Sequence, residues 1–233
     1  MKKLSFFFLL FAALTFSGCL TISENITFKK NGSGTMEYVI DATELMSNFG
    51  ELMANGTGQE NGGGNPLGKD FSTQAKAELL KKVAGVSKVK FEEDPKKGLF
   101  KLSFKFKNIK ALNDAMHQII AKGEGTPYTY FEQNGNTFKC NYGKGFGVDM
   151  ASLTGDDSDE MGEYAEKMNE GIRYKVNLDF GSEVNAVYTK LPSSQNEKEK
   201  ELAISGKSVK MQANHKVVGE GGSEVFSSTV ILK

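Results

Sequence analysis

Ile172-Arg-Tyr-Lys-Val-Asn-Leu-Asp-Phe180 alternates apolar and polar residues without a break and stops at Gly181. Successive side chains of a β-strand point to opposite faces of a sheet, so this stretch predicts a strand with one buried and one exposed face. The run Phe100-Lys-Leu-Ser-Phe-Lys-Phe-Lys107 repeats the pattern. Both stretches predict a sheet that covers an apolar core on one side only.

Further strands are predicted around these two. Leu20–Phe28 and Thr35–Ile40 flank a turn cluster, and Val89 and Phe91 lead through a turn at 94–98 into the strand from Phe100. Asn134-Gly135 is a strong hairpin signal between residues 128–133 and 137–142. After Gly181 the chain predicts only strands, at 184–189, 202–204, 209–217 and 226–232.

Three amphipathic helices are predicted between the strands. Asp41 and Glu44 resemble a capping box that opens a helix ending at Ala54. Ser72 or Thr73 caps a second helix that ends at Gly85, and Asn108 caps a third that stops at Gly123. The apolar stripe of the second helix is Ala75, Leu79, Leu80 and Val83, and that of the third is Ile109, Leu112, Met116, Ile119 and Ile120.

This order predicts an α+β fold, an antiparallel sheet with amphipathic helices packed on one face and a β-rich C-terminal part. Residues 55–70 and 143–170 are rich in glycine and polar side chains, and we expect them to be mobile loops. We expect residues 19–233 to form one α+β domain. A boundary near residue 171 is the alternative, although a terminal unit of roughly 60 residues would bury little surface alone.

The N-terminus predicts export and lipid attachment. Positive Lys2 and Lys3 precede the apolar run Leu4–Phe16, which is too short to span a bilayer but has the length of a signal-peptide core. Phe16-Ser17-Gly18-Cys19 resembles the lipobox of bacterial lipoproteins, although Phe16 stands where that family usually has Leu, Val or Ile. The resemblance implies a signal peptide at 1–18, cleavage before Cys19, and fatty acyl chains on Cys19.

Composition excludes some functions for the exported chain. Loss of Lys2 and Lys3 from 29 basic residues leaves 27 against 29 acidic ones, so no basic excess points to nucleic acid. Cys19 and Cys140 are the two cysteines, which rules out a disulfide framework. No acidic cluster follows Cys19, so we expect attachment to the outer membrane, with the protein facing the periplasm.

Motifs with known chemistry are incomplete. Gly63, Gly68 and Lys69 match the phosphate-binding G-x-x-x-x-G-K, but Asp70 replaces the metal-binding Ser or Thr and no strand precedes. The acidic run 149–170 holds eight carboxylates against Lys167 alone, yet fails the EF-hand spacing, so we favour a solvated loop over a calcium site. We therefore predict no metal and no cofactor.

The candidate nucleophiles and metal ligands are also isolated. His117 and His215 have no partner at metal-ligand spacing, and Cys140 lies on one strand face with Phe138 and Tyr142, where a core thiol is the better interpretation. We predict no catalytic residue. Six aromatic and aliphatic side chains could instead line a cavity for a lipid, although a packed core is the favoured interpretation: Phe100, Leu102, Phe104, Phe106, Tyr128 and Tyr130.

The lysines of the two strands on either side of the turn at 94–98 are predicted to lie on the face opposite that core. They could meet anionic headgroups, but a solvated sheet face is the simpler interpretation. These residues are Lys88, Lys90, Lys101, Lys105 and Lys107.

The strand directly after Cys19 and the run Phe28-Lys-Lys-Asn-Gly-Ser-Gly-Thr-Met-Glu-Tyr-Val-Ile-Asp41 resemble uncharacterised bacterial envelope lipoproteins. A weaker likeness, which includes the glycine turn Leu178-Asp-Phe-Gly-Ser-Glu-Val184, is to LppM-type lipoproteins. That family is implicated in envelope glycolipid interaction. The resemblance implies a glycolipid or apolar ligand here and no catalytic residue.

Two hypotheses follow from the sequence. The first is a non-enzymatic envelope protein, held at the membrane through Cys19, that binds an apolar or glycolipid ligand or a protein partner. The alternative is an envelope hydrolase acting on glycans or lipids through carboxylates of the 149–170 loop.

Overall fold

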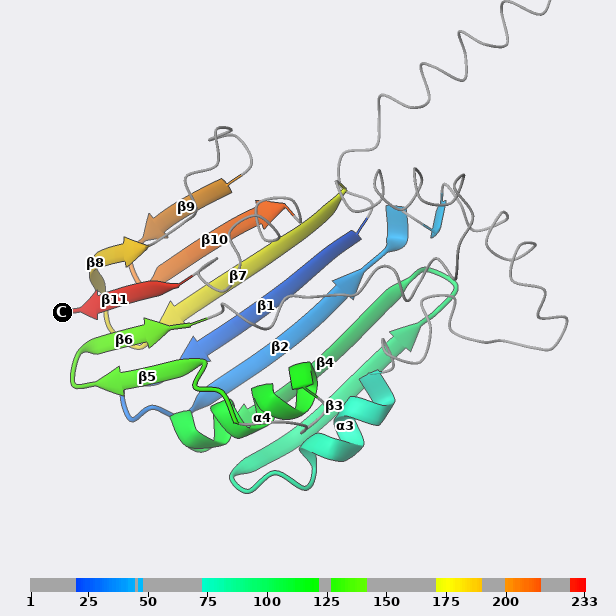
Figure 1. The fold of residues 1–233 in the computed structure, drawn as a ribbon, viewed down its shortest axis with the longest axis horizontal. Helices are drawn as coiled ribbons and strands as arrows, with labels where there is room; N and C mark the ends of the chain where they lie inside the picture. Colours follow the sequence, from blue (N-terminus) through cyan, green and yellow to red (C-terminus); the bar gives the residue numbers. More distant parts are fainter. Residues whose placement is uncertain are drawn as a thin grey trace, which may run out of the picture.

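A computed structural model gives the fold of residues 20–44, 46–47, 73–121, 127–141, 171–189, 200–214 and 227–233 (Figure 1). The strands and helices follow in the order β1 (Leu20–Phe28), β2 (Gly34–Asp41), α3 (Thr73–Leu80), β3 (Val86–Asp94), β4 (Leu99–Phe106), α4 (Ile109–Ala121), β5 (Phe131–Asn134), β6 (Thr137–Cys140), β7 (Ile172–Phe180), β8 (Val184–Thr189), β9 (Lys200–Ser205), β10 (Ser208–Asn214) and β11 (Ser228–Leu232).

These strands form a seven-stranded sheet in the order β3-β4-β2-β1-β7-β10-β9 and a four-stranded sheet in the order β5-β6-β11-β8. The helices α3 and α4 and the hairpin β5–β6 lie on the same side of the large sheet (Figure 1). The predicted α+β class with an antiparallel-rich sheet is confirmed. One pairing was not predicted: β1 and β7 run parallel, in register from Leu20↔Ile172 to Phe28↔Phe180.

The alternation predicted for β7 and β4 is confirmed in the burial of their side chains. In both strands the odd-numbered side chains stay exposed or half-buried, while the even-numbered ones lie under the helices and the small sheet. The fully buried side chains of these strands are Phe100, Leu102, Phe104, Phe106, Ile172, Tyr174, Val176, Leu178 and Phe180. They therefore belong to a packed core.

A cluster of phenylalanine rings joins the two sheets. Phe28, at the end of β1, stacks on Phe180 with ring centroids 5.4 Å apart and meets the edge of Phe106 at 5.9 Å. It also contacts Phe131 at 5.8 Å and Phe138 at 5.1 Å, both in the small sheet. Apolar burial between facing sheets is the main stabilising force of such a layer, and Phe28 lies at its centre.

The helix α4 forms as predicted. Asn108 caps it, since its Oδ1 accepts a hydrogen bond from the backbone N–H of Ala111 at 2.9 Å. Leu112, Met116 and Ile119 are buried, and Ile109 and Ile120 pack at the edge of the core.

The stripe predicted for the second helix is wrong in part. In α3 the buried residues are Thr73, Ala77 and Leu80, whereas Ala75 is exposed. The reason is tertiary: Glu93 of β3 holds the N-terminus of the helix, accepting hydrogen bonds at 2.8 Å from the Thr73 hydroxyl and from the backbone N–H of Gln74. The partner that holds the start of the helix is 20 residues away, so a local pattern cannot reveal it.

β3 departs from the simple alternation predicted for Val89 and Phe91. Its register against β4 shifts between Ser87 and Lys90, where Lys88 adopts a φ of 52°. This β-bulge turns the edge strand, so that Val89 is half-buried and Phe91 is 40% exposed.

Three predicted segments fall largely or wholly outside the described residues. Of the helix expected over 41–54, helical residues are described at 43–44 and 46–47, and Asp41 Oδ1 accepts a hydrogen bond from the Thr43 N–H at 3.0 Å. The loops at 55–70 and 143–170 lie outside the described part of the chain.

Candidate functional site

The lipidation site predicted at Cys19 lies one residue before the described part of the chain, which begins at Leu20. Leu20 is already core: its exposed fraction is 1%, and it opens both β1 and the parallel ladder with Ile172. The polypeptide has no linker between Cys19 and the sheet. Whatever is attached to Cys19 therefore sits at one end of the β1 strand.

Cys140 is a free cysteine, buried on β6, and the interpretation as a core thiol is confirmed. Burial raises its pKa to about 12, against a smaller opposing effect of a hydrogen bond with Ser228. A thiol with such a pKa is protonated at neutral pH and is a poor nucleophile.

The structure describes one of the two histidines. His117 lies buried on α4, one turn after Asn113, and His215 falls outside the described residues. Within the described ranges, no three His, Cys, Asp or Glu side chains come together as a metal site would require. The acidic run 149–170 and the segment Gly63–Lys69 also fall outside those ranges.

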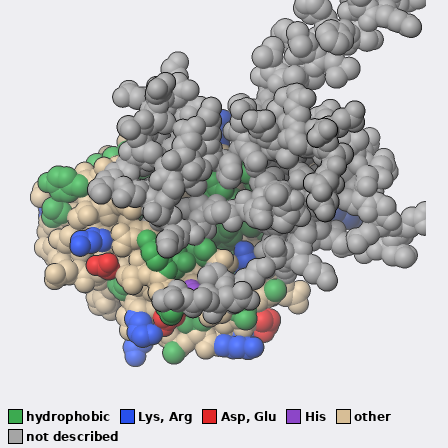
Figure 2. Space-filling view, viewed as in Figure 1, with side chains coloured by type: hydrophobic (Ala, Val, Ile, Leu, Met, Phe, Trp, Pro, Cys, Tyr) green, Lys and Arg blue, Asp and Glu red, His purple; other side chains and the backbone are tan. Residues whose placement is uncertain are grey.

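The aromatic and lysine faces of the large sheet are separated as predicted. Phe100, Leu102, Phe104 and Phe106 of β4 point into the core, and Tyr130 is buried edge-to-face with Tyr128 at 4.9 Å. Lys88, Lys90 and Lys105 are exposed on the opposite face, around a hollow of about 510 Å³. Figure 2 shows basic and acidic side chains next to one another on the described surface.

A buried carboxyl group was missed by the sequence analysis. Glu24 is 1% exposed on the inner face of β1, opposite Tyr38 of β2 and Val176 of β7. The signal was present in the sequence, because Glu24 occupies the apolar phase of an otherwise regular strand, between Ile22 and Ile26.

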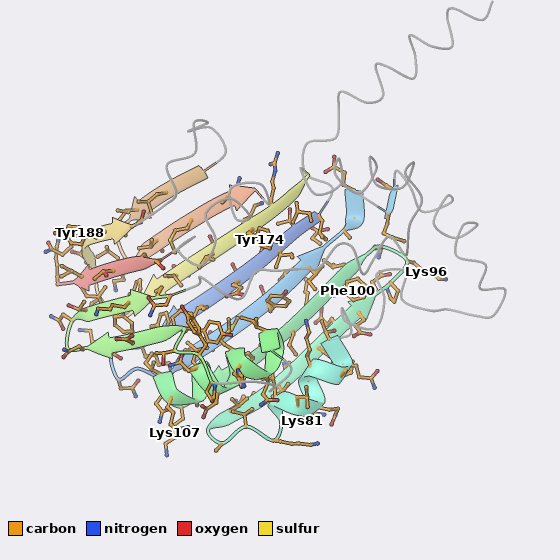
Figure 3. The ribbon with its side chains drawn as sticks, viewed as in Figure 1. Lys81, Lys96, Phe100, Lys107, Tyr174 and Tyr188 are labelled. Atoms are coloured by element: carbon orange, nitrogen blue, oxygen red, sulfur yellow. The ribbon has the colours of Figure 1, made fainter. Side chains whose placement is uncertain are left out.

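Tyrosine side chains surround this carboxyl group. Burial, and then the charge of Glu24, raise the pKa of Tyr38 far above its ordinary value. The same two causes raise the pKa of Tyr130 to about 12. Tyr174 lies on β7 in the middle of the sheet, whereas Tyr188 is 64% exposed at the edge (Figure 3). The cluster around Glu24 is thus a polar element of the core and is closed to a ligand from solvent.

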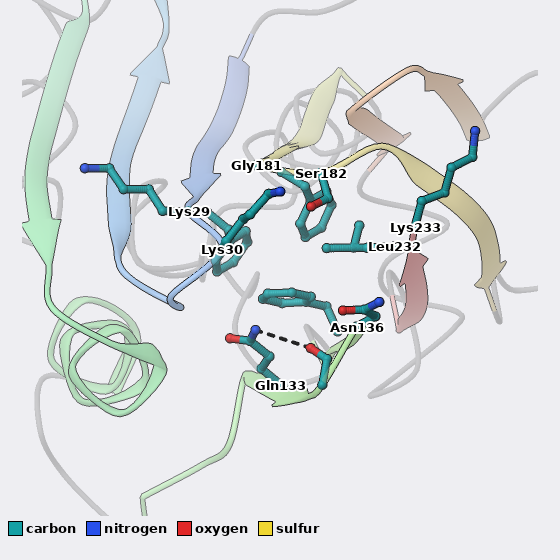
Figure 4. Close-up of a pocket in the computed structure, with 12 residues that line it drawn as sticks. Lys29, Lys30, Gln133, Asn136, Gly181, Ser182, Leu232 and Lys233 are labelled. Atoms are coloured by element: carbon teal, nitrogen blue, oxygen red, sulfur yellow. Dashed lines mark hydrogen bonds between the residues drawn. The ribbon is translucent and has the colours of Figure 1, made fainter.

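A second feature lies at the other end of β1 from Cys19, where several turns enclose a pocket of about 180 Å³ (Figure 4). We call it the strand-end pocket. Its lining comes from the β1–β2 turn, the β5–β6 turn, the β7–β8 turn and the end of the chain: Phe28, Lys29, Lys30, Gln133, Gly135, Asn136, Phe138, Phe180, Gly181, Ser182, Leu232 and Lys233.

Backbone hydrogen bonds fix these turns. The Lys29 N–H donates to Ser33 O at 2.7 Å, and the turn passes through Gly32 with a φ of 75°, which a side chain would strain. The Leu232 N–H donates to Asn136 O at 2.8 Å, which ties the end of β11 to the β5–β6 turn. The floor is the phenylalanine cluster, so the pocket has a rigid base.

The charge around the strand-end pocket is positive. Lys29, Lys30 and Lys233 line it, and the charge of Lys207 contributes to lowering the pKa of neighbouring Glu183. Glu183 lies next to it and pairs with Lys233, with Nζ and Oε2 2.8 Å apart. The Lys233 ammonium group lowers the pKa of Glu183.

Comparison with known proteins assigns no family. No protein-family model and no curated protein matches the chain. Among solved structures, the NMR structure of the folded domain of the Mycobacterium tuberculosis LppM protein is similar over 93% of this chain and 91% of that one, with 10% identity and a TM-score of 0.40. A likeness at this level carries no argument, so a functional proposal depends on this chain's own residues.

Proposed function

We propose that this protein is a non-enzymatic binding protein of the bacterial cell envelope, held at the membrane by acyl chains on Cys19. The observation that carries the proposal is the junction at residues 19 and 20. The folded sheet starts at Leu20, directly after the lipobox-like Phe16-Ser17-Gly18-Cys19, so the residues ahead of Cys19 contribute no strand to the described sheets.

None of the described helices is long and apolar enough to cross a bilayer. Two or three acyl chains make attachment effectively lasting, because each buried methylene contributes about 0.8 kcal/mol. We place the protein on the outer membrane, facing the periplasm.

The missing linker gives the tethered protein a defined orientation. β1 spans nine residues from Leu20 to Phe28. At about 3.3 Å per residue, the strand carries its far end about 30 Å from the anchored cysteine. The strand-end pocket would then open away from the membrane that holds the acyl chains, toward molecules in the periplasm.

A binding role without catalysis is supported by the state of the candidate nucleophile and of the buried acid. Cys140 is enclosed in the core with a raised pKa, and Glu24 is enclosed among tyrosines. Neither group can reach a substrate from solvent in this fold.

Replacement of the anchor tests the proposal. In cells that process lipoproteins, Cys19→Ala should abolish incorporation of labelled fatty acid and move the protein from the membrane to the soluble fraction. Cys140→Ala is the matched control, since it removes the other cysteine, and it should remain acylated and membrane-bound. Unchanged fractionation of Cys19→Ala, together with wild-type protein that carries no acyl label, would refute lipid attachment.

A further inference from the structure

We infer that the strand-end pocket binds a small, water-soluble molecule that carries an oxyanion group, a phosphate or a carboxylate. The position of the pocket away from the membrane rests on the proposed function, whereas its affinity for an oxyanion depends only on the residues that line it.

The lining offers mainly hydrogen-bond donors. The Lys30 side chain reaches toward Gly181 and Ser182, while Lys29 points away (Figure 4). Lys30 and Gly181 are in close contact, since a Cβ on Gly181 would lie 3.3 Å from Lys30 Cγ. The side chains of Asn136 and Ser182 line the same space. The pocket thus brings together an ammonium, an amide and a hydroxyl group, and each of these can donate a hydrogen bond to an oxyanion.

Two backbone carbonyl groups of the lining already accept hydrogen bonds. The backbone carbonyl of Asn136 accepts from the Leu232 N–H, and that of Gly135 accepts from the Gln133 side chain at 3.4 Å. Consequently an anion would not have to displace these carbonyl groups to reach the donors of the pocket.

The charges also favour an anion. Glu183 lies beside the pocket and forms an ion pair with Lys233, whose ammonium group lowers the pKa of Glu183. No ion pair involves Lys30 within the described part of the chain, so its charge is available to a ligand. Lys29 also lines the pocket, although its ammonium group points away, and the charge of Lys207 acts on Glu183, so further basic residues lie close by.

The size of the pocket limits the ligand. Its 180 Å³ is below the roughly 300 to 1,000 Å³ of sites that enclose a drug-sized molecule. The rings of its floor, Phe28, Phe138 and Phe180, are packed against one another and against the core. This leaves room for a phosphate or carboxylate group with a few attached carbon atoms, and no slot for an acyl chain.

The pocket is also preorganised. Backbone hydrogen bonds hold the β7–β8 turn against the β9–β10 turn, from Phe180 N–H to Lys207 O at 2.9 Å and from Val184 N–H to Gly206 O at 2.8 Å. A ligand therefore does not have to order a loop when it binds, which removes a common cost of association.

Calorimetric titration of the full chain, purified in detergent, tests the inference. The probes are inorganic phosphate, glycerol 3-phosphate and acetate at constant ionic strength. We expect at least one to bind with one site per chain. Lys30→Gln removes a positive charge, and Asn136→Asp adds a negative charge with nearly the same side-chain shape. Each should lower the affinity for that probe about tenfold.

Lys210→Gln is the matched control. Lys210 is an exposed lysine on the outer face of β10, opposite Asn177 and Ala203, and its replacement changes the net charge equally. The affinity of the Lys210→Gln variant for the probe should equal that of the wild type. Circular dichroism and thermal melting of all variants establish that they fold.

A separate titration distinguishes a soluble ligand from a lipid headgroup. Vesicles of phosphatidylglycerol and of phosphatidylcholine are added to the Cys19→Ala chain, which lacks the anchor. Binding of a soluble probe that Lys30→Gln weakens and Lys210→Gln does not supports the inference. Absence of binding by all three probes, equal affinity in Lys30→Gln, or binding to anionic vesicles alone would overturn it.

The two proposals fail separately. If Cys19 carries no acyl chain but the soluble probe still binds, the lipid anchor is refuted and the pocket stands. If Cys19 is acylated and no probe binds, the pocket is refuted and the anchor stands.

Discussion

Phe28→Ala should be the most damaging single truncation in the core. Phe28 is 1% exposed and contacts four other rings, Phe106, Phe131, Phe138 and Phe180, at centroid distances between 5.1 and 5.9 Å. Truncation of a buried Phe costs about 3 to 5 kcal/mol, and each lost ring pair adds about 0.5 to 1.5 kcal/mol beyond area burial. These terms overlap in part, so we expect a loss of about 5 kcal/mol.

Urea denaturation of the Cys19→Ala chain, followed by circular dichroism, measures this loss. Phe91→Ala is the matched control, because it removes the same atoms from an edge strand where the side chain is 40% exposed. It should cost less than about 1 kcal/mol. Since single domains are stable by about 5 to 15 kcal/mol, Phe28→Ala comes close to unfolding the protein.

Phe28→Leu serves if the alanine variant does not fold. It retains an apolar side chain and should cost about 1 to 3 kcal/mol. Equal free energies of unfolding for the Phe28 and Phe91 variants would refute the assignment of Phe28 to the centre of the ring cluster.

Two further predictions concern the small sheet. Asn113→Ala should destabilise the protein by about 2 to 3 kcal/mol, because it leaves the buried backbone N–H groups of Tyr130 and Phe131 without the Asn113 Oδ1 that accepts from them at 3.0 and 2.8 Å. Asp114→Ala is the control, because it removes only the surface ion pair with Lys110, and it should change the free energy of unfolding by less than about 0.5 kcal/mol in the same denaturation assay. Equal losses of stability in the Asn113 and Asp114 variants would contradict the role of Asn113. Burial raises the pKa of Cys140 from 9.0 to about 12, so the thiol ionises at lower pH in the unfolded chain than in the folded one. Its contribution to stability is therefore complete below pH 9 and is lost as the pH rises to about 12. Thermal melting from pH 8 to 11 should show a steeper fall for the wild type than for Cys140→Ala, and identical slopes would refute the burial of this thiol.

Local sequence patterns predicted most of the strands, since strict alternation in Ile172–Phe180 and Phe100–Phe106 reports which face is buried. The Asn108 cap and the apolar face of α4 were also visible, because both depend on residues within four positions of each other. Asn134-Gly135 marked its hairpin for the same reason, and Gly135 takes the positive φ of 57° that such a turn requires.

Contacts between distant residues were not visible in the sequence. Glu93 caps α3 across 20 positions, and the buried residues of this helix, Thr73, Ala77 and Leu80, differ in part from its predicted stripe. The parallel pairing of β1 with β7 places Leu20 beside Ile172. The alternation within a strand does not indicate which strand it pairs with, or whether the pair is parallel or antiparallel. Glu24 interrupts the apolar pattern of β1 in the sequence. The folded sheet was needed to show that its carboxyl group is buried among tyrosines.

The sequence by itself determined the fold class, the positions of most strands, the cap of α4 and the expectation of acyl chains on Cys19, because each is encoded by neighbouring residues. Only the tertiary structure decided the order of the strands in both sheets and the meeting of Lys30, Asn136 and Ser182 around one pocket. Those residues come from three turns far apart in the chain, and the packing of the phenylalanine cluster beneath them is what brings the turns together.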